Sequence, residues 1–219
     1  MKSFYLFVVI SITLFSCSNS SQCKDLESAY PPEIFTLYQH KGKDYNAIKV
    51  FKISENQIQV NHISITPAED LAPLQQTLVK KELFSIEEKD RIKEKYKKAY
   101  SLQLKHTNDV FWIQIQPTKE MLGDKKDFEY RDMIEDLINK ELMNNNAGIF
   151  FAGHVGHTGL NMLCHYYKER VAIESIFKIL CENGLEDHTL IAKRVHVADA
   201  DWIHEVVYPL GFTGEFQSL

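Results

Sequence analysis

The clearest pattern of apolar and polar positions lies in the second half of the chain. Two segments place apolar residues at helical spacing and predict amphipathic helices, 127–143 and 169–184. Four segments rich in β-branched and aromatic residues predict strands: 110–116, 149–154, 160–167 and 189–197. Their order predicts an α+β fold with a ferredoxin-like βαββαβ antiparallel sheet, covered by the two helices on one face.

The chain around these elements carries signals for their ends. Gly184 follows the second helix, where a glycine commonly ends a helix. The last apolar stretch, 199–209, predicts a short closing helix that ends at Pro209. Asp199 would cap this helix, and Trp202 and Tyr208 would pack it on the sheet.

The first half of the chain has weaker patterns. Residues 46–53 and 57–65 alternate between apolar and polar side chains and predict a β-hairpin. Residues 67–84 predict a helix that Pro73 interrupts. A strand at 100–106 is expected to pair with residues 110–116.

Residues 85–100 predict a further helix that opens with a capping box formed by Ser85 and Glu88. Its apolar stripe is thin, with Ile92 and Tyr96 standing among many charged residues. This pattern is typical of a solvated helix and favours that interpretation over a basic binding face. The predicted fold of residues 33–100 is therefore an N-terminal α+β region, a β-hairpin with helices packed on it, next to a ferredoxin-like domain over 101–219.

The N-terminus has the pattern of a secretory signal. Lys2 precedes an apolar run from Phe4 to Phe15, which is too short for a bilayer span of about 20 residues. The run ends in Leu-Phe-Ser before Cys17 and resembles a bacterial lipobox. This resemblance implies removal of residues 1–16 and lipidation of Cys17, although an ordinary signal peptide with a chance cysteine is the alternative.

Residues 17–32 are polar, lack periodicity and end in two prolines, which predicts a flexible tether. The chain has a formal net charge of −5 and no basic stripe, which argues against nucleic acid as a partner. Its 44% hydrophobic content supports a packed core. We therefore expect a bacterial envelope protein that a lipid holds on a membrane, facing the periplasm or the cell exterior.

Four cysteines occur, and no Cys-x-x-Cys motif joins any two of them. Lipidation of Cys17 would leave Cys23, Cys164 and Cys181. The spacing allows Cys164 and Cys181 to meet, and an oxidising envelope permits a disulfide. We expect both to be buried free thiols, with a disulfide between them as the alternative.

The stretch AGHVGHTG, at 152–159, carries the most conspicuous candidate chemistry. His154 and His157 are imidazoles of the kind that bind zinc, but a zinc site needs a third or fourth converging ligand. We expect instead a hairpin turn in which Gly153, Gly156 and Gly159 supply positive φ angles. The second interpretation is a metal-dependent hydrolase that uses the two histidines.

Asp199, Asp201 and Glu205 form an acidic cluster with His204 near the end of the last predicted strand. A general acid–base pair requires carboxylates at a defined separation, and the sequence defines none. We interpret the cluster as structural. The chain also lacks a nucleophile elbow, a P-loop and the His-Glu-x-x-His motif, so we predict that it is not an enzyme and needs no cofactor.

Residues 100–210 resemble a bacterial family catalogued as domain of unknown function 695, which occurs alone or joined to a domain like the regulator of ribonuclease E activity B. The matching features are the helix acids Glu135 and Asp136, an aromatic strand end at Tyr166–Tyr167 and two motifs. The motifs are the hairpin Gly156, Thr158 and Gly159, and the ending Asp199, Trp202, Tyr208 and Pro209. The resemblance implies an α/β domain without established catalytic residues.

Together these features predict a binding or accessory module of the cell envelope, with an envelope protein as its partner. Its docking surface would be the sheet face that the C-terminal helices leave uncovered, or an exposed sheet edge.

Overall fold

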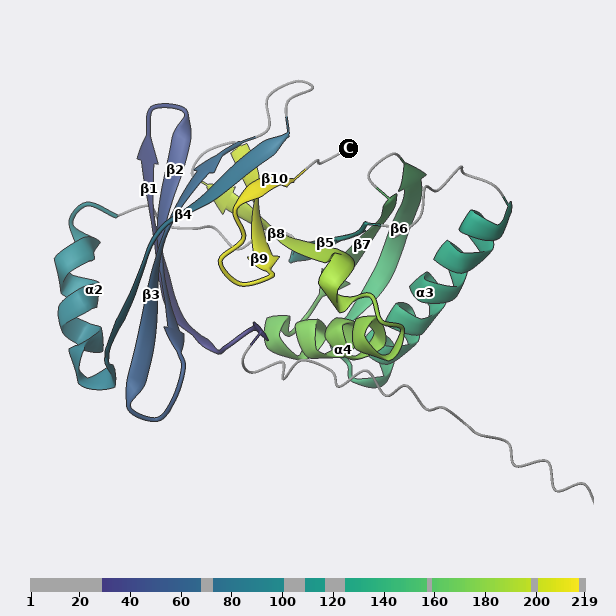
Figure 1. The fold of residues 1–219 in the computed structure, drawn as a ribbon, viewed down its shortest axis with the longest axis horizontal. Helices are drawn as coiled ribbons and strands as arrows, with labels where there is room; N and C mark the ends of the chain where they lie inside the picture. Colours follow the sequence, from purple (N-terminus) through teal and green to yellow (C-terminus); the bar gives the residue numbers. More distant parts are fainter. Residues whose placement is uncertain are drawn as a thin grey trace, which may run out of the picture.

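The computed structural model describes residues 29–67, 73–100, 109–116, 125–156, 159–197 and 201–216 (Figure 1). The signal peptide 1–16, Cys17 and the tether up to residue 28 lie outside these ranges, as does the strand expected at 100–106 apart from its first residue. The pairing expected between that strand and residues 110–116 is wrong, because residues 110–115 pair with 160–165 on one side and with 189–193 on the other. The described chain forms two five-stranded antiparallel sheets with the helices α2, α3 and α4. None of the described helices has the length and apolar character needed to cross a bilayer.

The first sheet has the order β1-β2-β3-β4-β10. Its strands are β1 (Glu33–Lys41), β2 (Asp44–Lys52), β3 (Gln57–Thr66), β4 (Leu74–Ser85) and β10 (Gly214–Phe216). The hairpin predicted at 46–53 and 57–65 is confirmed as β2 and β3. β10 comes from the end of the chain and pairs with β4, so the C-terminal segment completes the first sheet.

The second sheet has the order β6-β7-β5-β8-β9. Its strands are β5 (Val110–Ile115), β6 (Gly148–Gly156), β7 (Gly159–Tyr166), β8 (Thr189–Val197) and β9 (Asp201–Tyr208). The four strands predicted in this half are confirmed as β5, β6, β7 and β8. All six residues of β5 are buried because this central strand is covered on both faces.

The predicted helices at 127–143 and 169–184 are confirmed as α3 (Lys125–Asn144) and α4 (Glu169–Glu182). Gly184 has a φ of 65°, as expected of a glycine that ends a helix. The helix predicted from residue 85 begins with a 3-10 turn, η1 (Ile86–Glu88), and continues as α2 (Lys89–Lys97). Both bonds of the capping box between Ser85 and Glu88 are present.

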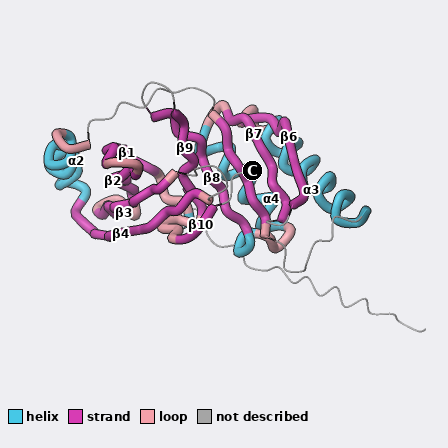
Figure 2. Tube along the Cα trace, turned by 90° about the horizontal axis from the view of Figure 1, so that it is seen from above, coloured by secondary structure: helices cyan, strands magenta, loops and turns pink. Residues whose placement is uncertain are grey.

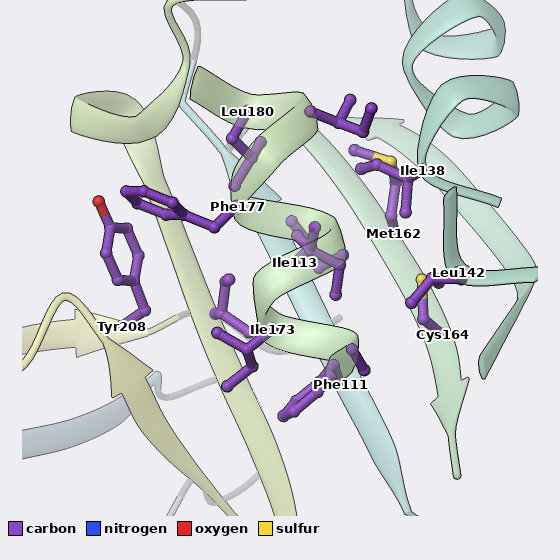
Figure 3. Packing of buried hydrophobic residues seen from close by; sticks show 14 of the residues in the cluster. Phe111, Ile113, Ile138, Leu142, Met162, Cys164, Ile173, Phe177, Leu180 and Tyr208 are labelled. Carbon is purple, nitrogen blue, oxygen red and sulfur yellow. The ribbon is translucent and has the colours of Figure 1, made fainter. Parts of the chain in front are cut away.

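The helices and sheets are arranged in layers (Figures 1 and 2). Three clusters of apolar side chains lie between these layers. Helix α2 packs through Ile92 on one face of the first sheet. The other face of that sheet packs against the second sheet, where Tyr38 and Ile65 join Trp112 and Val206. Helices α3 and α4 cover the far face of the second sheet, and Figure 3 shows their side chains over β5 and β7.

Two predicted helices are strands in the structure. The helix expected over 67–84 is wrong from residue 74 on, because this segment pairs with β3 along its length as β4. The closing helix expected over 199–209 is also wrong, since residues 201–208 pair with β8 as β9. Residues 203–208 of β9 are all buried, so no alternation marks them as a strand. An end strand at 33–41, β1, has no counterpart in the predicted elements.

Gln76 joins the two sheets at β9. Its side-chain amide donates to Val206 O at 3.0 Å, and its Oε1 accepts from Val206 N at 2.9 Å. The amide thereby occupies the outer edge of β9 as a neighbouring strand would, which satisfies buried backbone groups. The outer edge of β6 is capped in a similar way, because Phe150 N donates to Asn139 Oδ1 of α3 at 3.0 Å.

Candidate functional site

The glycine-rich stretch at 152–159 is a hairpin, as predicted, with Gly156 paired to Gly159 across the turn. We expected positive φ angles at Gly153, Gly156 and Gly159. Of these three glycines only Gly159 has one, with a φ of 102°. At Gly153 the reason is space, because a Cβ there would lie 1.7 Å from Glu135 Oε1. A Cβ at Gly156 would meet only the end of the His154 ring, at 3.0 Å from Nε2.

His154 lies exposed on β6, whereas His157 and Thr158 lie outside the described residues. Among the residues that the structure describes, no three His, Cys, Asp or Glu side chains converge in a way that could hold a metal ion. The described part of the chain therefore brings no third ligand to His154. The hydrolase interpretation gains no support from it.

The C-terminal motif of the family resemblance is placed in part. Asp199 lies outside the described residues, and of Trp202 only the backbone, in β9, is described. The helix that Asp199 was expected to cap is the strand β9. Tyr208 is buried, donates a hydrogen bond to Glu186 O at 3.0 Å and meets the Phe177 ring edge-on (Figure 3). Pro209 follows it in a turn after a cis peptide bond.

The described cysteines differ in state. Cys164 is a buried free thiol, and burial together with the nearby Glu135 carboxylate raises its pKa to about 12. Such a thiol stays protonated at neutral pH and is a poor nucleophile. Cys181 is disulfide-bonded, so the expectation of a free thiol there is wrong, as is the alternative pairing with Cys164. The partner of Cys181 lies outside the described residues.

Buried charges cross the boundary between the two sheets. Lys49 of β2 lies 2.9 Å from Glu205 Oε1 of β9 and 3.3 Å from Glu33 Oε2 of β1. Tyr38 donates a hydrogen bond to the other carboxylate oxygen of Glu205 at 2.7 Å. We call these four residues the inter-sheet ion cluster. Lys49 and Glu205 have almost no exposed side-chain surface, so each charge depends on the other residues of the cluster.

The pKa shifts follow from this geometry. Burial lowers the pKa of Lys49, but Glu205 and Glu33 oppose burial more strongly and hold it above its usual value. Burial and the Glu205 charge raise the pKa of the Tyr38 hydroxyl, so it stays a donor. In this cluster Lys49 and Tyr38 of the first sheet both contact the Glu205 carboxylate of the second sheet. These contacts help to hold the two sheets in one relative position.

A second group of ions borders this cluster at the start of α4. Lys193 of β8 contacts both oxygens of Glu169, at 2.9 and 3.1 Å. Tyr30 donates to the same carboxylate at 2.9 Å. Burial lowers the pKa of Lys193, and the Glu169 and Glu33 charges together raise it above its usual value. This group joins the chain entering β1 to the second sheet.

Glu205 is part of the acidic cluster noted in the sequence, but we did not expect Lys49 and Tyr38 beside it. One signal was present, since Lys49 interrupts the apolar residues Ile48 and Val50. A lysine in a strand usually marks a solvent-facing side, and here that side faces the second sheet.

The surface of the second sheet carries an apolar patch on the face opposite α3 and α4. The first sheet covers this face over β5, β8 and β9, while β6 contributes no residue to the cluster between the sheets. On β6 and β7 the Phe151 and His165 rings stack with centroids 4.3 Å apart. Ile149 pairs with His165, and Tyr167 stands two positions after His165, in the bend that follows β7. We call these four residues the β6–β7 aromatic patch.

Ile149, Phe151 and Tyr167 are 38%, 47% and 61% exposed, so the patch is open to solvent. Large apolar side chains that gather on a surface mark interaction sites more often than isolated ones do. The patch lies on a sheet face that α3 and α4 do not cover, the kind of surface that we predicted for docking. The sequence did not indicate these four residues as a group.

Comparison of the chain with protein-family models, with curated proteins and with solved structures finds no match.

Proposed function

We propose that the chain is a lipid-anchored protein of a bacterial cell envelope and that its globular part binds an envelope protein without catalysing a reaction. The observation that carries the binding role is the β6–β7 aromatic patch, with Phe151 and Tyr167 about half exposed or more. The lipid anchor is supported by the lipobox-like residues that end at Cys17.

The ionic chemistry of the described residues supports a binding role over catalysis. In the interior, Lys49 forms an ion pair with Glu205 Oε1 at 2.9 Å and Tyr38 donates a hydrogen bond to Glu205 Oε2. Groups held in this way stabilise a fold, whereas a general acid or base has to reach a reacting atom. The exposed surface, and not the buried cluster, is therefore the functional part of our proposal.

We also assign β5 to β8 with α3 and α4 to the ferredoxin-like arrangement. The assignment is supported by the order β6-β7-β5-β8 and by a helix in each of the connections β5–β6 and β7–β8. β9 then extends the sheet beyond β8. The relationship to domain of unknown function 695 stays a prediction from the motifs quoted above.

The docking role is tested by a photo-crosslinking amino acid at position 151 of the full chain in its own cells. We expect one protein adduct of defined mass, which Tyr167→Glu on the same patch abolishes. The control places the same crosslinker at Leu83, which is 55% exposed on β4 of the other sheet. The same adduct from position 83, or none from 151, would overturn the docking role.

The anchor is tested separately by labelling cells with a fatty-acid probe. We expect the wild-type protein to be labelled and Cys17→Ser to lose the label. An unlabelled wild-type protein would disprove the lipid anchor and leave the docking experiment unaffected.

A further inference from the structure

We propose that β1, the outer strand of the first sheet, takes up an extended acidic peptide segment of a partner as an additional antiparallel or parallel strand. This inference rests on the proposed binding function and gives it a second, more specific surface. It names the recognition mode, which is backbone pairing along a sheet edge.

The first observation concerns the sheet edges. Among the residues that the structure describes, β1 ends the first sheet over the nine residues Glu33–Lys41 and pairs only with β2. In the second sheet a side chain bonds to one backbone residue of each edge strand, Gln76 to Val206 of β9 and Asn139 to Phe150 of β6. In the described part of the chain no side chain bonds to the outer backbone of β1 in this way. An uncovered edge of this length is a template for another strand.

The second observation is the apolar border of β1. Phe35 and Leu37 face α2 and are only partly buried by its packing on the sheet. A strand added beside β1 would place alternate side chains next to them. Apolar residues at every second position of the added strand would complete this packing.

The third observation sets the charge of the partner. Lys93 of α2 lies over the Phe35 ring, with Nζ 5.7 Å from its centroid. Lys89 and Lys97 stand four residues before and after it, on the same side of the helix. We call these three lysines the α2 lysine row. Lys93 is the member that contacts β1, and Lys97 lies 3.5 Å from Glu94 Oε1 on the same helix. The net charge of the whole chain is −5. Electrostatic complementarity therefore favours acidic side chains on the added strand.

The probe is a blocked nine-residue peptide of alternating Glu and Val, added to the purified full chain in detergent. Binding is followed by fluorescence anisotropy with a labelled copy, and hydrogen exchange is read amide by amide. We expect saturable binding and slower exchange at alternate amides of β1, because a new strand pairs with every second residue of an edge. The same peptide with Lys in place of Glu should bind several-fold more weakly.

Lys93→Glu should weaken binding of the acidic peptide several-fold, since it reverses a charge beside the docking edge. The matched control is Lys98→Glu, the same charge change one residue beyond α2, on another side of the helix. Equal losses in both variants would show a general charge effect and overturn the proposal. Protection at β6 instead of β1, equal binding of the lysine peptide, or no binding would do so as well.

These outcomes are separable from those of the proposed function. The peptide experiment reads β1 in purified protein, whereas the crosslinking experiment reads Phe151 in cells. A crosslinked adduct at position 151 without protection of the β1 amides would support the proposed binding function but disprove peptide binding at β1.

Discussion

Lys49 Nζ lies 2.9 Å from Glu205 Oε1, and the two residues belong to different sheets. Each member of this pair has a second polar neighbour. Tyr38 donates a hydrogen bond to the other oxygen of Glu205, and the Glu33 carboxylate lies 3.3 Å from Lys49 Nζ. A charge pair without solvent contact is stabilising only while every member has its partner. This relationship makes the inter-sheet ion cluster a sensitive point of the fold.

We predict that Lys49→Met lowers the free energy of unfolding by about 3 kcal/mol or more, because it leaves the Glu205 charge buried without its cation. The triple variant Tyr38→Phe, Lys49→Met, Glu205→Leu should recover most of the loss, since it removes the buried polar groups together. Urea unfolding curves measure both. A single variant that loses less than about 1 kcal/mol would contradict the role of the cluster.

Stability should also fall in mild acid because of His204. Burial, with a smaller contribution from the Arg194 charge, lowers the pKa of His204 to about 4. In the unfolded chain the His204 imidazole is protonated as the pH falls through about 6.5. In the folded chain it stays neutral until the pH falls to about 4. The stability that His204 contributes is complete above pH 6.5 and is lost as the pH falls toward 4.

The loss from this one group is on the order of 3 kcal/mol, from the size of the shift. Urea unfolding at pH 7 and pH 4.5 measures it. His204→Asn should reduce the difference between the two pH values, whereas His188→Asn, an exposed substitution, controls for the loss of a histidine as such. A pH dependence that is the same in His204→Asn and in the wild type would assign the effect to other groups.

Gly153 and Gly156 give a matched pair of substitutions in one hairpin. Gly153→Ala should destabilise the protein by about 1 kcal/mol, because its Cβ would push aside the Glu135 carboxylate, which is mostly buried and lies 3.4 Å from Arg131 Nε. Gly156→Ala should cost less, since its Cβ meets only the movable end of His154. Thermal unfolding of the two variants tests the difference. Glu135→Ala should relieve the Gly153→Ala variant, and a lack of relief would show that the collision is not the cause.

The sequence predicted the parts of this fold in which local pattern and packing agree. Helix α4 buries eight residues, seven of them apolar, so its helical period is clear. The sequence of β4 predicts a helix because its second half is rich in Lys and Glu. The sequence of β9 does not alternate between apolar and polar residues, because both faces of this strand are buried. Their strand identity comes from pairing with β3 and β8, which no local pattern contains.

The candidate site was predictable to a smaller extent. An uncovered sheet face was expected, but its position depends on how the first sheet lies over β5, β8 and β9. The partners Tyr38 and Glu205 are 167 positions apart, so their contact follows only from the assembled sheets. The hairpin histidines stood out in the sequence, yet the described residues bring no further ligands to His154.

The disulfide of Cys181 makes the proposed anchor testable in a second way. Cys164 is free, and the sequence has two further cysteines, Cys17 and Cys23, both outside the described residues. A lipidated Cys17 has no thiol left for a disulfide. The proposed anchor therefore predicts that Cys181 pairs with Cys23 and that the bond ties the segment after the anchor to α4.

Peptide mapping of the mature protein without reduction should show a Cys23–Cys181 peptide pair in the wild type and in Cys17→Ser. Cys23→Ser should remove it and lower the free energy of unfolding by about 2–4 kcal/mol. A Cys17–Cys181 pair in the mature protein would disprove the lipid anchor directly.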